Sequence, residues 1–198
     1  MISNSNSFFN NLEFVRETTF NQFSIIVDKK NKFYYLFKDN KPILICKLQQ
    51  NSYNIYDLDN RKVAELRKER YFFNKKYYLY FKEKKNNQVI GIFEKKKENE
   101  NLLFIPITHE FNGMNTFKDY KDLKSEKKKK LLIEEYPFIK SVRYKNTIES
   151  KKNSKYFYSN RLVFEISKYL DNSYNLYFDK PLSIIQGFSL GLICILTG

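Results

Sequence analysis

Few residues of this sequence could do chemistry on a substrate. The single histidine, His109, stands in the segment PITHEF, which has neither metal-site nor catalytic-triad spacing. Cys46 and Cys194 lie in apolar runs, which is typical of small buried side chains and not of a disulfide framework or a metal set. The carboxylates lie mainly in turns beside lysine, and no phosphate-binding loop or zinc-protease motif occurs. We therefore expect no catalytic residue, no metal site and no cofactor, and a protein that is not an enzyme.

Positive charge is the main chemical property of the chain. Lysine and arginine number 36 against 22 acidic residues, which gives a formal net charge of +14. An AT-rich coding sequence would favour lysine codons and would explain this charge without a function. The alternative is attraction to phosphates, either of an anionic membrane surface or of nucleic acid. Arginine is scarce, and because bidentate recognition of phosphate or guanine favours arginine, we expect no specific nucleic-acid partner.

The strongest concentration of charge lies in residues 117–136, FKDYKDLKSEKKKKLLIEEY. This Lys-rich insertion interrupts the pattern on either side of it. It is interpreted either as a solvated segment or as an electrostatic contact patch for an acidic surface. The lipid-binding hypothesis rests on five of its side chains: Lys124, Lys127, Lys128, Lys129 and Lys130. The pattern does not predict the structure of residues 108–155.

The rest of the chain reads as strands joined by short turns. Apolar or aromatic runs such as FSIIVD and FYYLFKD recur every 8 to 12 residues, and the turns between them are charged. Glycine is scarce, so the turns must be made mainly by Asn, Asp and Lys. Tyr174, Leu176 and Phe178 show the period of two that is typical of a strand with one buried face. We predict a mainly β, antiparallel domain over residues 20–198, preceded by a loose leader over 1–19.

The final segment, SIIQGFSLGLICILTG, has a different pattern. A helix over residues 182–197 would be about 24 Å long, which is shorter than the roughly 30 Å that a bilayer core requires. It is apolar on every side and must be surrounded by protein or by lipid. The spacing of its two central glycines allows another backbone to come close. We favour a core helix inside a closed sheet, with the following residues in the core: Ile185, Gly187, Phe188, Gly191, Leu192 and Ile195.

This organisation resembles that of the tubby C-terminal-like superfamily, in which an antiparallel barrel is wound around a C-terminal apolar helix. Residues 171–196, DNSYNLYFDKPLSIIQGFSLGLICIL, look like the last strand and core helix of LURP-one-related and phospholipid scramblase-like proteins. FSIIVDKKNKFYYLFKD and YNIYDLDNRKVAELRKE resemble the repeated strand–Asp turn–strand units of the family. The likeness covers about residues 20–107 and 155–198.

The resemblance implies a closed antiparallel β-barrel that surrounds a C-terminal hydrophobic α-helix. Tubby proteins bind phosphoinositides through basic residues, but these do not match positions of this sequence. Scramblases carry a calcium site and a cysteine-rich segment, and the presence of only two cysteines, both in apolar runs, argues against that equipment here. LURP-one-related proteins have no established catalytic chemistry, so the resemblance transfers a fold and no site.

We expect a non-catalytic barrel domain that binds anionic phospholipid or phosphoinositide at a membrane surface. The first residues, MISNSNSFFNNLEF, lack the basic and apolar regions of a signal peptide, so a cytoplasmic protein is expected by default. The lipid hypothesis adds that it is peripheral at membranes. Two alternatives stay open. One is a tail-anchored membrane protein whose anchor is Leu182–Thr197, and the other is a non-specific nucleic-acid binder that uses its lysine runs. The ligand, the protein partners and the oligomeric state are left open by the sequence.

Overall fold

The computed structural model describes residues 21–50, 52–71, 74–82, 87–95, 102–106, 139–143, 148, 150–158, 160–179 and 182–197. These residues form twelve strands and one helix, in the following order: β1 (Asn21–Asp28), β2 (Phe33–Lys38), β3 (Lys41–Gln49), β4 (Ser52–Tyr56), β5 (Lys62–Tyr71), β6 (Asn74–Lys82), β7 (Asn87–Lys95), β8 (Leu102–Pro106), β9 (Ile139–Arg143), β10 (Ser154–Tyr158), β11 (Arg161–Leu170), β12 (Ser173–Phe178) and α4 (Ile184–Thr197).

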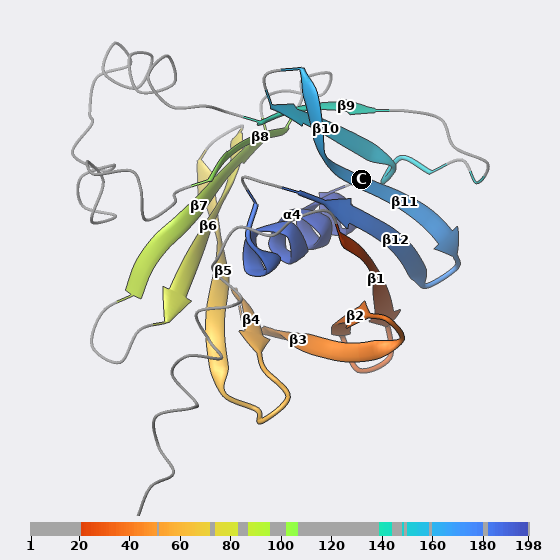
Figure 1. The fold of residues 1–198 in the computed structure, drawn as a ribbon. Coiled ribbons are helices and arrows are strands. Elements are labelled where there is room, and N and C mark those ends of the chain that lie inside the picture. Colours follow the sequence, from red (N-terminus) through yellow and green to blue (C-terminus); the bar gives the residue numbers. More distant parts are fainter. Residues whose placement is uncertain are drawn as a thin grey trace, which may run out of the picture.

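Each strand pairs antiparallel with the next along the chain, and β1 also pairs with β12, so that the sheet forms a closed barrel (Figure 1). The closing pair runs from Asn21 opposite Phe178 to Ile26 opposite Ser173. The predicted mainly β class, with an antiparallel sheet and a C-terminal helix, is confirmed.

The turns follow the side-chain chemistry that the sequence predicts. The Asp28 carboxylate accepts hydrogen bonds from the Asn31 backbone N–H at 3.1 Å and from its amide at 2.7 Å. Asp57 accepts in the same way from the Arg61 backbone N–H at 2.8 Å and from its Nε at 2.7 Å. In the described residues the left-handed backbone positions are held by Asn, Asp, Lys and Gln, and by no glycine. Side chains that bond their own main chain therefore make these turns, as expected where glycine is scarce.

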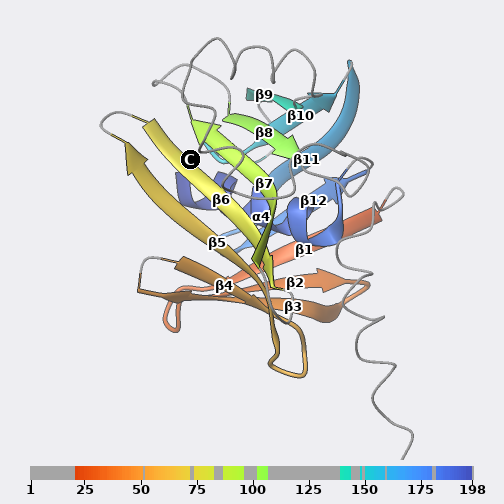
Figure 2. The ribbon, with the colours of Figure 1, turned by 90° about the vertical axis from the view of Figure 1, so that its left-hand side faces the viewer.

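The helix α4 lies inside the ring of strands, which Figures 1 and 2 show from two directions. Every residue from Ile185 to Ile195 is buried, and this run contains all six of the predicted core positions. The helix begins at Ile184, two residues later than predicted, because Ser183 caps it. The Gln186 N–H donates to Ser183 Oγ at 3.3 Å and the Ser183 N–H donates to Gln186 Oε1 at 2.9 Å, which is a capping box. Among the described residues no helix is long and apolar enough to cross a membrane.

The two glycines of α4 lie where the barrel wall comes closest. A Cβ atom at Gly187 would stand 2.7 Å from the ring of Phe178, and one at Gly191 would stand 2.7 Å from Cδ1 of Ile25. The Phe178 ring is in turn stacked on Phe23, with centroids 4.5 Å apart. The G-x-x-x-G spacing thus serves close packing against strands β12 and β1.

Candidate functional site

The lysines of the lipid-binding hypothesis, Lys124 and Lys127 to Lys130, lie outside the described residues. The same is true of the rest of the predicted insertion at 117–136, of His109 and of the predicted leader at 1–19. The hypothesis for these lysines stays a prediction. A site in the described part of the chain has to be sought on the barrel itself.

The strand register builds an aromatic surface on the outside of β1 to β4. Leu36, Leu44 and Ile55 are fully buried, so Tyr35, Ile45 and Tyr56 beside them in their strands point outward. One outward row runs through Ile26, Tyr35, Ile45 and Tyr56, which lie opposite one another in successive strands. The next row brings Phe33 beside Lys47. We name this surface the aromatic–lysine face and define it by these residues: Ile26, Phe33, Tyr35, Phe37, Ile45, Lys47 and Tyr56.

The side chains of this face are partly open to solvent. Ile26 is 40% exposed, and the other members are intermediate between buried and exposed. The rings of Phe33 and Tyr35 meet edge to face, with centroids 6.2 Å apart, and Tyr35 lies 6.4 Å from Phe37. A run of ring contacts therefore continues along the outer side of β2. Surface this apolar on the outside of a barrel is typical of a contact region.

Lys47 places a positive charge between two rings of the face. Its Nζ lies 5.5 Å from the ring centroid of Phe33 and 4.9 Å from that of Tyr56, and both distances allow cation–π attraction. The same Nζ donates a hydrogen bond of 3.1 Å to Asn60 Oδ1. The ammonium group is thus held at a fixed place within apolar surface.

Further lysines surround the aromatic–lysine face. Residues 28–47 contain six lysines and two aspartates. Lys29, Lys30 and Lys32 are exposed in the turn between β1 and β2, and Lys41 is exposed at the start of β3. Of the two acids, Asp28 has its carboxylate hydrogen-bonded to Asn31, and these bonds lower the pKa of Asp28. The region has the composition of a surface that attracts anions while it offers apolar groups.

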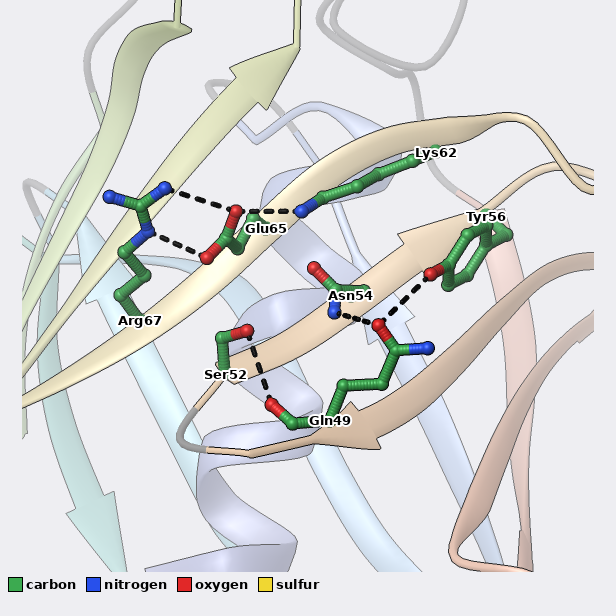
Figure 3. A network of polar contacts seen from close by, with 7 residues as sticks. All are labelled: Gln49, Ser52, Asn54, Tyr56, Lys62, Glu65 and Arg67. Atoms are coloured by element: carbon green, nitrogen blue, oxygen red, sulfur yellow. Dashed lines mark hydrogen bonds and ion pairs between the residues drawn. The ribbon is translucent and has the colours of Figure 1, made fainter.

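A polar network borders the face on β3, β4 and β5 (Figure 3). Gln49 Oε1 accepts hydrogen bonds from the Asn54 amide at 2.8 Å and from the Tyr56 hydroxyl at 3.4 Å. The bond to Tyr56 orients one ring of the aromatic–lysine face. The network is therefore a support for the face.

Figure 3 also shows the Glu65 carboxylate, both of whose oxygens already accept hydrogen bonds. The Glu65 carboxylate accepts hydrogen bonds from Lys62 Nζ at 2.7 Å and from Arg67 Nε at 2.6 Å and Nη2 at 3.2 Å. Chiefly because of the bonds from Arg67, the pKa of Glu65 falls to about 2. A carboxylate with this pKa is a poor general base near neutral pH.

The cysteines lie where the sequence predicts them, in the core. Burial raises the pKa of the Cys46 thiol, so the reactive thiolate is disfavoured. Cys194 Sγ shares a hydrogen bond of 3.2 Å with the Tyr156 hydroxyl. Within the described ranges no group of three or more His, Cys, Asp or Glu side chains is arranged to hold a metal ion.

The aromatic–lysine face was missed by the sequence reasoning, although a signal for it exists. In FYYLFK the inward positions Tyr34 and Leu36 alternate with Phe33, Tyr35 and Phe37, so the strand is apolar on both sides. A strand of a barrel filled by a helix needs only one apolar side. The surplus on the second side is the sequence signal for the aromatic–lysine face.

Comparison with known proteins identifies a structure with a related fold. No protein-family model matches this sequence, and a search among curated proteins found no match. An X-ray structure of a protein from Arabidopsis thaliana is similar, with a TM-score of 0.50 and 12% sequence identity, over 94% of this chain and 93% of that one. At this level of identity the likeness shows that the two chains share a related fold, and it carries no site from one to the other.

Proposed function

We propose that this chain is a non-catalytic member of the tubby C-terminal-like superfamily, closest to the LURP-one-related group, that binds anionic phospholipid at the surface of a membrane. In this proposal the protein is cytoplasmic and peripheral. The family assignment is supported by the ending of the sequence and by a closed strand order around α4. The lipid assignment is supported by the aromatic–lysine face.

One observation carries the lipid assignment, which is the placement of Lys47 between the rings of Phe33 and Tyr56. The ring of Tyr56 is amphipathic and favours the boundary between headgroups and acyl chains, and the ring of Phe33 adds apolar surface beside it. A lysine among them meets the phosphate of the headgroup while its stem stays in apolar surroundings. Each basic residue near an anionic surface contributes about 1 kcal/mol.

The test is co-sedimentation with vesicles of phosphatidylcholine alone and of phosphatidylcholine with phosphatidylserine or with a phosphoinositide. The variants are Lys47→Gln and the combined change of Lys29, Lys30 and Lys32 to Gln. We expect Lys47→Gln to weaken binding about fivefold and the triple variant to weaken it more. The differences should shrink in 1 M salt, where the Debye length is about 3 Å. Lys151→Gln is the matched control, because Lys151 is exposed in the turn before β10 and is not one of the residues that define the face.

The Lys-rich insertion makes a separate prediction. If it contributes to the membrane contact, changing Lys124, Lys127, Lys128, Lys129 and Lys130 to Gln should weaken binding to phosphatidylserine vesicles at low salt. Loss of binding in this variant, with none in the variants of the aromatic–lysine face, would remove the face from the proposal. Competition by single-stranded or duplex DNA that abolishes vesicle binding would favour the non-specific nucleic-acid binder instead.

A further inference from the structure

A groove of about 480 Å³ lies over strands β1, β12 and β11. Its size falls in the range that is usual for small-molecule sites. It is lined by Gln22, Phe23, Leu162, Glu165, Ser167, Asn175, Leu176 and Tyr177. None of these residues belongs to the aromatic–lysine face or to the Lys-rich insertion.

The strand register places the polar members of this lining on the outside of the barrel. Leu176 and Phe178 are buried and point inward, so Tyr177 between them points outward, and so does Gln22, which precedes the buried Phe23. Gln22 lies opposite Tyr177, which lies opposite Glu165, and these three residues form one row across the strands.

A second row lies one step along the strands and contains Asn175 opposite Ser167. Two strand spacings and one step of two residues give the polar surface a footprint of about 10 Å by about 7 Å. Five side chains from three strands converge on it. The footprint suits a small ligand of one or two rings.

Among the described residues, the lining offers hydrogen-bonding side chains and no positively charged side chain. Two amides, from Gln22 and Asn175, and the hydroxyl of Ser167 can each donate and accept. The charged group of the lining is the Glu165 carboxylate, and Lys155 Nζ lies 3.6 Å from it. An anionic ligand would meet a carboxylate here, and a cationic ligand would compete with Lys155 for it. Beside Tyr177 the charges of Arg161 and Asp179 are likewise paired with each other, so the surroundings favour a neutral ligand that carries several groups able both to donate and to accept.

Tyr177 adds a ring and a protonated hydroxyl. Burial, assisted by the nearby Asp179 carboxylate, raises the pKa of Tyr177, so its phenol keeps its proton. The ring supplies apolar surface, as does Leu162. Flat apolar surface with several hydrogen-bonding side chains around it suits a ring that bears hydroxyl groups on its edge and C–H groups on its faces.

We infer that this groove is a binding site for a neutral polyhydroxylated ligand of the saccharide class. Gln22, Asn175 and Ser167 bond its hydroxyl groups, Glu165 accepts from one of them, and Tyr177 contacts the ring. The site is separate from the proposed membrane contact, and neither requires the other.

The test is a titration of the full chain, followed by the backbone amide signals in two-dimensional NMR. The probes are maltose, cellobiose and lactose at millimolar concentration, with inositol hexakisphosphate and choline as an anionic and a cationic comparison. We expect at least one disaccharide to shift the amide signals of Gln22, Ser167 and Asn175. Gln22→Leu and Asn175→Leu should each weaken that binding about tenfold, since each removes hydrogen bonds to the ligand.

The side chains of Gln22 and Asn175 are both exposed, so the two variants should fold. Their thermal unfolding temperatures should equal that of the parent. Asn172→Leu is the matched control, because Asn172 is exposed in the turn between β11 and β12 and does not line the groove. The inference is overturned if none of the three disaccharides shifts the groove signals. It is also overturned if the shifts persist unchanged in both variants, or if either charged compound binds the groove more tightly than every disaccharide. Vesicle binding should be the same in Asn175→Leu as in the parent, so the two proposals fail independently.

Discussion

Glu65 shows how a single side chain can be fully engaged without taking part in chemistry. Lys62 and Arg67 satisfy both of its oxygens at the edge of the aromatic–lysine face. The three residues belong to one strand, in which Glu65 and Arg67 share a side. The arrangement keeps the carboxylate charged and leaves Lys62 and Arg67 less available to an external anion.

We predict that Glu65→Gln lowers the free energy of unfolding by about 1–2 kcal/mol at neutral pH, because charge-assisted bonds are lost while Arg67 stays partly exposed. The pKa of Glu65 is 4.5 in the reference state and about 2 in the fold. A lowered pKa contributes stability above pH 4.5, and this contribution is lost as the pH falls toward about 2. The difference between parent and variant in urea unfolding should therefore narrow over this range.

The control for this prediction is Asp171→Asn. Asp171 is 97% exposed and lies 3.6 Å from Lys168, so its removal should change stability little. A difference between parent and Glu65→Gln that stays constant from pH 7 down to pH 2 would contradict the linkage argument.

At the scale of the element, α4 carries two serines with opposite roles. Ser183 Oγ accepts the Gln186 N–H and caps the helix. Ser189 is fully buried, and its Oγ has no hydrogen-bond partner in the described structure. The same residue type should therefore have opposite effects on stability at these two positions.

We predict that Ser183→Ala lowers the free energy of unfolding by about 1 kcal/mol through loss of the cap. Ser189→Ala should leave it unchanged or raise it by about 1 kcal/mol, because an unsatisfied hydroxyl is removed from the core. Thermal unfolding of the two variants, compared with that of the parent, measures both changes in stability. Equal destabilisation by both changes would show that the Ser189 hydroxyl has a partner in the folded protein.

The two glycines of α4 should also differ from each other. Alanine has the higher helix propensity, so a change to Ala gains about 1 kcal/mol where there is room. At Gly187 the new methyl group would meet the Phe178 ring, which is fixed by stacking on Phe23. At Gly191 it would meet the ends of the Ile25 and Leu176 side chains, at 2.7 Å and 3.2 Å, which are single methyl groups and not a ring. Gly187→Ala should cost about 1–3 kcal/mol and Gly191→Ala distinctly less. If chemical denaturation shows that Gly191→Ala is the more destabilising of the two, the Phe178 ring moves aside to accommodate the new methyl group at Gly187.

At the scale of the whole molecule, the barrel depends on α4 as its common packing partner. Strands from both ends of the chain pack their inward residues on it, among them Ile25 and Leu176. The helix lies at the end of the sequence, so its contacts join segments that are far apart in the chain. The strands cannot bury their inner faces without it.

We predict that removal of residues 183–198 unfolds the whole domain. Loss of one buried Leu or Ile side chain costs about 2–5 kcal/mol, and a domain has only about 5–15 kcal/mol in total. The measurement is thermal unfolding of residues 1–182 in buffer without detergent. A cooperative transition near that of the full chain would contradict the role of α4 as a core helix. It would favour the tail anchor of Leu182–Thr197.

The class of the fold could be predicted from sequence because its signals are local. Tyr174, Leu176 and Phe178 alternate along one strand, and all three are buried as that period requires. Apolar residues on every side of α4 require enclosure whatever the details of the wall. The start of the helix was misplaced by two residues, although the Ser183 and Gln186 pair of the capping box is visible in the sequence.

Contact between distant segments was decided only by the tertiary structure. The sequence indicates that another backbone approaches Gly187 and Gly191, but the partners, Phe178 and Ile25, follow from how the barrel closes. The aromatic–lysine face requires the register of four strands, which sets Ile26 opposite Tyr35 and Lys47 opposite Phe33. A shift of one residue in any of these pairs would turn the side chains to the other face. Register depends on packing against α4 and on closure of β1 with β12, and neither is encoded in the pattern of a single strand.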